Sequence, residues 1–125
     1  MSAEFVEDFL LRFAKSAVEG DHAGHMAMVS KKVRVLGVPG FEAIDYDSWS
    51  QQCAHEFPQF LIRSIEYVGI DIKQETGTLV CFETHEKVEA GDGTVNSNRL
   101  EIFIECEEDG KWRIVQESIL PTPLH

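Results

Sequence analysis

The most informative stretch of this chain is residues 96–120, NSNRLEIFIECEEDGKWRIVQESIL. It holds two segments, Asn96 to Cys106 and Trp112 to Leu120, that are rich in β-branched and aromatic residues. Such residues favour β-strands. The turn signal Glu108-Asp109-Gly110 separates them. Because so short a link cannot hold the crossover that parallel strands need, the stretch predicts an antiparallel pair.

Two further segments upstream have the same composition. Ile62 to Lys73 and Thr78 to Val88 are bounded by Glu75-Thr76-Gly77 and Gly91-Asp92-Gly93. The second half of the chain is therefore predicted to be a four-stranded antiparallel meander. In the last strand, simple alternation places Trp112, Ile114 and Gln116 on one face and Arg113, Val115 and Glu117 on the other.

The first half of the chain has a helical pattern instead. Apolar residues recur at helical spacing from Phe5 to Ala17, with Ser2 as the expected N-cap and Gly20 as the stop. Asp21 is expected to cap a short helix that ends near Met28, and residues 33–38 are expected to form a strand. Asp45 should cap a third helix, which Pro58 ends. Helices followed by strands indicate an α+β fold with the helices on one face of the sheet.

Length and charge restrict the possible functions. A chain of 125 residues predicts a single domain, residues 1–125. Its net charge of −11 argues against nucleic acid and anionic membranes as partners. The three cysteines lie far apart in sequence, which favours a reducing compartment and hence a cytoplasmic location. No phosphate loop, nucleophile elbow or dinucleotide fingerprint is found, and no cofactor is expected.

The segment Asp109-Gly110-Lys111-Trp112-Arg113-Ile114-Val115, together with the pattern of the first helix, resembles the NTF2-like (SnoaL-like) superfamily. This resemblance implies three N-terminal helices packed on a strongly bent antiparallel sheet, which encloses a cone-shaped pocket. Members include isomerases, dehydratases, polyketide cyclases, hydrolases and non-catalytic binding modules, so the resemblance does not imply one function. The last strand has Gln116, Glu117 and Ser118 where many members have histidine or aspartate.

The candidate catalytic residues are Glu83 and His85. They are two residues apart on one strand, so they share a face and could act as an acid–base pair in an apolar cone. The alternative is a solvated strand face. Tyr67 should donate a hydrogen bond if it faces the cone, and belong to a dimer core if it faces outward. The candidate ligand-binding residues are Phe9, Phe13, Trp49, Tyr67, Arg99, Glu101 and Gln116.

No metal site is expected, since neither Glu83 with His85 nor the pair His22 and His25 has a further ligand at suitable spacing. The two histidines of the short helix are interpreted as surface residues. Both faces of the last strands carry apolar residues, which predicts a homodimer through the outer face.

Two functions remain open at this stage. One is a protein that binds a hydrophobic small molecule, with possible acid–base catalysis. The other is a non-catalytic dimeric module for a protein partner. A cavity above ~300 Å³ with a buried ionisable group favours the first, and a cone filled by aromatic side chains favours the second.

Overall fold

The four predicted strands pair in sequence order, as expected. In the computed structural model, which describes residues 3–59 and 61–121, every neighbouring pair among these strands is antiparallel. The strands are β2 (Ile62–Glu75), β3 (Leu79–Ala90), β4 (Val95–Cys106) and β5 (Trp112–Leu120). Their composition and the short turns between them therefore predicted this half of the fold correctly.

A fifth strand, β1 (Val29–Leu36), lies at the edge of the same sheet and runs parallel to β5. The order across the sheet is β1-β5-β4-β3-β2, so the sheet is mixed rather than wholly antiparallel. The expected strand at residues 33–38 thus begins earlier, at Val29, and ends before Gly37. Parallel pairing is possible here because a helix and three strands connect β1 to β5.

Three helices precede or interrupt this sheet: α1 (Ala3–Val18), α2 (His22–Met26) and α3 (Tyr46–Glu56). The Asp45 carboxylate accepts from the Ser48 N–H at 2.9 Å, which confirms the predicted N-cap of α3. Asp21 caps α2 in the same way. The expected cap Ser2 lies outside the described residues. Within residues 3–59 and 61–121, no helix has the length and apolar content needed to cross a membrane.

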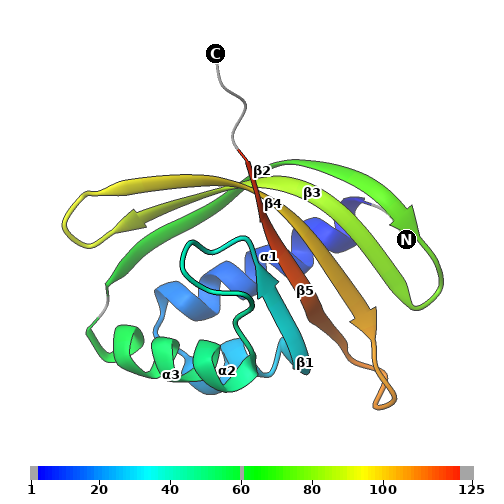
Figure 1. The fold of residues 1–125 in the computed structure, drawn as a ribbon, viewed down its shortest axis with the longest axis horizontal. Helices are drawn as coiled ribbons and strands as arrows, with labels where there is room; N and C mark the ends of the chain where they lie inside the picture. Colours follow the sequence, from blue (N-terminus) through cyan, green and yellow to red (C-terminus); the bar gives the residue numbers. More distant parts are fainter. Residues whose placement is uncertain (1–2, 60, 122–125) are drawn as a thin grey trace.

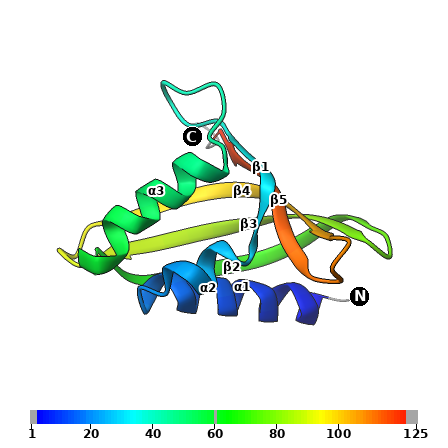
Figure 2. The same ribbon diagram turned by 90° about the horizontal axis from the view of Figure 1, so that it is seen from below.

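The long strands curve over α1, and α2 and α3 lie together at one end of the molecule (Figure 1). Seen from below, α1 runs along β2 (Figure 2). The core fills the space between α1 and the concave face of the sheet. Its largest fully buried side chains are Phe9, Leu10, Phe82, Leu100, Ile102, Ile104 and Ile114.

A β-bulge in β5 changes which of its side chains face inward. Ile104 pairs with Ile114, but the preceding residue, Phe103, pairs with Gln116, so Val115 is an extra residue. Ile114 and Glu117 consequently share the concave face, and Gln116 lies on the outer face. The alternation predicted from sequence, with Ile114 and Gln116 on one face, was wrong because an inserted residue reverses the parity of everything after it.

Candidate functional site

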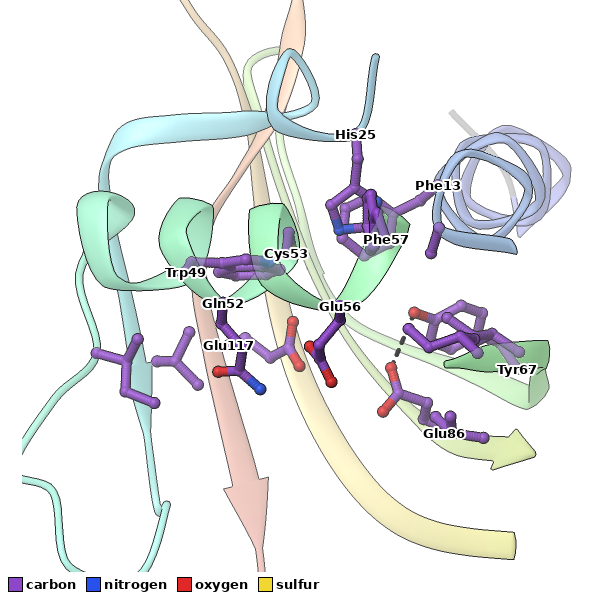
Figure 3. A pocket seen from close by; sticks show the side chains of 16 residues that line it. Phe13, His25, Trp49, Gln52, Cys53, Glu56, Phe57, Tyr67, Glu86 and Glu117 are labelled. Atoms are coloured by element: carbon purple, nitrogen blue, oxygen red, sulfur yellow. Dashed lines mark hydrogen bonds between the residues drawn. The ribbon is translucent and has the colours of Figure 1, made fainter. Parts of the chain in front are cut away.

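A cavity of about 220 Å³ lies between the helices and the concave face of the sheet (Figure 3). Its walls are mostly apolar and aromatic: Phe13, Val35, Ile44, Trp49, Phe57 and Val88. α3 contributes Trp49 because the side chains of Trp49, Cys53 and Phe57 recur at four-residue spacing along its inner side. The volume is below the ~300 Å³ set above as a sign of small-molecule binding, so that size criterion is not met, and the space suits a molecule of about one ring.

Tyr67 and Glu86 form the first polar pair in this cavity. The Tyr67 hydroxyl donates to a Glu86 carboxylate oxygen at 2.9 Å, across the β2–β3 pair (Figure 3). Burial raises the pKa of Glu86 and the hydrogen bond from Tyr67 lowers it, with a net rise. Burial, with the charge of Glu86 adding to it, raises the pKa of Tyr67 as well. Tyr67 therefore faces the cone and supplies a donor, one of the two placements considered from sequence.

Glu117, brought inward by the bulge, is the second acid of the cavity. Its carboxyl group has no hydrogen-bond partner among the described residues, and Figure 3 shows it directed into the same space as the side chains of Gln52 and Glu56. Burial, reinforced by the negative charge of Glu86, raises the pKa of Glu117 to about 8. At neutral pH this carboxyl is therefore mainly protonated, while its neighbour Glu86 accepts a hydrogen bond.

His25 lies at the inner end of the cavity, with 4% of its surface exposed. The Ser16 hydroxyl donates to the Phe13 carbonyl at 2.6 Å and lies 2.8 Å from His25 Nδ1. Since a hydroxyl has one proton, Nδ1 is the donor to Ser16 and Nε2 carries the lone pair. Burial, the largest cause, lowers the pKa of His25 to about 4, so the ring is neutral at pH 7. The ring also stacks on Phe13, with centroids 4.1 Å apart. The interpretation of His25 as a surface residue was wrong.

The structure separates the residues proposed from sequence into three groups. Phe13, Trp49 and Tyr67 line the cavity. Phe9 is buried in the core beside it, 1% exposed. The remaining members, Arg99, Glu101 and Gln116, lie on the outer face of the sheet.

Glu83 and His85 also lie on the outer face. Glu83 accepts from Arg99 at 3.3 Å, and His85 is exposed opposite Arg99 in the β3–β4 pair. Their parity is opposite to that of Phe82 and Glu86, which point inward, so they do not line this cavity.

Glu86, Glu117 and His25 are the cavity residues that sequence reasoning missed. Glu86 shares the parity of the apolar residues Val80, Phe82 and Val88, and that signal was present in the sequence. Glu117 could not be found by alternation, because the bulge that turns it inward has no signature in the residues themselves. His25 gave no signal because its burial depends on packing between α1 and α3.

Other hollows lie outside the cone. One of about 310 Å³, on the outer face, is lined by Glu83, His85 and Arg99 among others, and Glu83 is already paired with Arg99. A groove of about 450 Å³ lies between α1 and β2, lined by apolar residues such as Leu10, Leu11 and Ile70 together with Glu7 and Glu66. Tyr67 reaches both spaces, and the two acids of the groove, Glu7 and Glu66, are exposed to solvent. Within the part of the chain that the structure describes, no three metal-ligating side chains converge. The cavity with Glu86 and Glu117 is therefore the candidate site.

No protein-family model matches the sequence, and no curated protein matches it. Among solved structures, an NTF2-like protein from Cytophaga hutchinsonii superposes with a TM-score of 0.77 at 11% identity, covering 98% of this chain and 99% of that one. A Novosphingobium aromaticivorans protein provisionally named a scytalone dehydratase gives a TM-score of 0.72 at 13% identity, over 94% and 82% of the two chains.

Bdellovibrio bacteriovorus Bd1075 is also similar, with a TM-score of 0.73 at 16% identity. The match covers 95% of this chain but 41% of that longer one. At such identities the likeness concerns the fold and not the activity. The bent sheet and the three helices agree with it, and the chain has the NTF2-like fold.

Proposed function

We propose that this protein binds a small, largely apolar molecule of about one ring in the cone cavity and moves a proton on it. The observation that carries the proposal is the pair of acids in an aromatic enclosure, where Glu117 has a pKa of about 8 and Glu86 is held by Tyr67. Their environments differ, which is the usual arrangement for one acid and one base. Glu86 is the proposed base and Glu117 the proposed acid.

Such a pair supports reactions in which one proton leaves the ligand and another is returned. Removal by Glu86 and delivery by Glu117 to a different atom gives an isomerisation. Delivery to a departing hydroxyl group gives a dehydration, with water as the second product. In either reaction the apolar walls limit contact with bulk water, and the neutral Nε2 of His25 offers a further acceptor to the ligand.

The binding part of the proposal is tested by filling the cavity. Val88 lines it, so Val88→Phe places a ring into the free space. Titration with benzyl alcohol, followed by the fluorescence of Trp49 in a Trp112→Phe background, should show saturable binding that Val88→Phe reduces at least about tenfold. Val95→Phe, at an exposed strand position, is the matched control and should bind normally. Equal binding by both variants would place the ligand elsewhere.

The proton-transfer part is tested with acetophenone, whose methyl protons exchange with deuterated water. The wild-type protein should accelerate this exchange, measured by NMR, and Glu86→Gln should reduce the acceleration by about 100-fold or more. Glu83→Gln is the comparison on the outer face, and it tests the sequence-based assignment. If Glu83→Gln lost the acceleration and Glu86→Gln kept it, the outer face would hold the base instead.

A further inference from the structure

The cavity is lined by several acidic side chains and by no strongly basic one among the described residues. Three of the residues that line it are glutamates, Glu56, Glu86 and Glu117, and neither lysine nor arginine is among the described lining residues. A ligand with a carboxylate or a phosphate would therefore bring like charges together in a poorly solvated space, which is costly.

The hydrogen-bonding groups of the cavity also disfavour an anionic ligand. The Tyr67 proton is already used on Glu86, and the Nδ1 proton of His25 is used on Ser16. What Tyr67 and His25 present to the ligand is thus lone pairs, and an ionised carboxylate also only accepts. Donors remain in the protonated Glu117 carboxyl and in the Gln52 amide at the exposed edge of α3, and Glu117 becomes an acceptor once it ionises.

The aromatic walls of the cavity also favour a cationic ligand. The rings of Phe13 and Trp49 meet edge to face, with centroids 6.1 Å apart, and Phe57 and Tyr67 line the same space. Aromatic faces attract a cation, and most strongly where water is excluded. Acceptors and ring faces together are complementary to a group that carries positive charge and several N–H donors.

We propose that the natural ligand carries a protonated amine on a one-ring apolar body, and that Glu117 binds this ammonium group. The proposal rests on the proposed function, because it concerns the same cavity. Glu117 then balances the ligand's charge instead of serving as the acid, and Glu86 both removes the proton and returns it to a second atom, as one carboxyl group can in an isomerisation.

Binding of an ammonium group should release a proton. The other titratable groups that line the cavity with Glu117 are Glu56 and Cys53 from α3, Glu86 from β3, Tyr67 from β2 and His25 from α2. None of them brings a positive charge at neutral pH. Glu117, protonated when the cavity is empty, would ionise to pair with the ammonium. Affinity for the amine should therefore rise from pH 6 to pH 8, whereas affinity for a neutral ligand should not.

The test compares benzylamine, benzyl alcohol and benzoate, which share one skeleton and differ in charge, by calorimetry at pH 7.5. We expect benzylamine to bind at least about tenfold more tightly than benzyl alcohol, and benzoate to bind most weakly. The heat of benzylamine binding should differ between phosphate and Tris buffers, because a proton is released. Glu117→Gln should bring benzylamine and benzyl alcohol within about threefold of each other.

Glu66→Gln is the matched control, since it removes the same charge from an exposed position of β2. It should keep the preference for the amine. If benzyl alcohol bound as well as benzylamine, or benzoate bound best, the amine proposal would be overturned while binding in the cavity stood. If none of the three compounds bound, the proposed function would fail and the amine proposal with it.

Discussion

Glu117 is half-buried and His25 is buried in the same cavity, and these two titratable residues affect stability with opposite signs. The folded protein holds the Glu117 proton up to a pKa of about 8, whereas an unperturbed glutamate has a pKa of 4.5. Between these values the folded state binds more protons than the unfolded state, so unfolding becomes easier as pH rises. For His25 the folded pKa is about 4 against 6.5, so stability rises with pH between those values.

From these signs we predict that the free energy of unfolding falls between pH 6.5 and 8, by up to about 1.4 kcal/mol per pH unit from Glu117. Between 4.5 and 6.5 the contributions of Glu117 and His25 oppose each other. Urea denaturation across this range checks it. Glu117→Gln should flatten the decline above pH 6.5, and Glu66→Gln should retain it. A wild-type stability that rises from pH 6.5 to 8 would contradict the assignment.

At the residue scale, the sequence predicted the parts of the site that depend on regular local patterns. Phe13 and Trp49 lie on helix faces that periodicity identifies, and Tyr67 was recognised as a donor if it faced inward. The inward face of β3 could also have been chosen correctly from Val80 and Phe82. The inward position of Glu117 depends on a bulge, and the burial of His25 depends on helix packing. Both involve residues distant in sequence.

Among the elements, α3 has the greatest influence on the site, since it supplies Trp49, Gln52, Cys53 and Glu56. Its start is determined by one local interaction, the hydrogen bond from the Ser48 N–H to the Asp45 side chain. That hydrogen bond also lowers the pKa of Asp45. This is why the sequence located α3 correctly.

We therefore expect Asp45→Ala to lower the free energy of unfolding by about 1 kcal/mol, because it removes the cap and leaves the Ser48 N–H without its partner. Asp45→Asn keeps a capping oxygen and should cost much less. Chemical denaturation of the two variants beside the wild type measures the difference. An equal loss in both would show that the charge of Asp45, and not its hydrogen bond, is what matters.

The pairing partner of β1 could not be predicted from the sequence. Its residues predicted a strand, but nothing local indicated that it would pair with β5 in parallel. Pairing partners are selected by the whole sheet, and Val35 reaches the cavity because it lies beside Glu117.

For the whole molecule, we propose a homodimer formed through the outer face of the sheet. Phe103 lies there, half-buried in one chain, opposite Gln116. The charges near it are paired within the chain: Arg113 with Glu107 and Asp109, and Lys32 with Glu105. Ile119 packs against the core instead, because the bulge reverses the face on which it lies.

Light scattering at micromolar concentration should give a mass twice the 14.1 kDa of one chain. Phe103→Arg should shift the mass toward the monomer, because it places a charge in an apolar contact on both sides of a two-fold axis. Lys15→Ala, an exposed change on α1, should leave the mass unaltered. A monomeric wild type at every concentration would rule out this contact.

The parallel pairing of Val35 with Glu117 has a consequence for how the protein is made. A ribosome adds about 5–20 residues per second, so β1 emerges seconds before the strand that must pair with it. Until β5 docks, the edge of β4 and the aromatic rings of the cone stay open to water and to other chains. Closing so long a loop is entropically slow. Docking of β5 should therefore be the late step of folding, and binding competence should appear only with it.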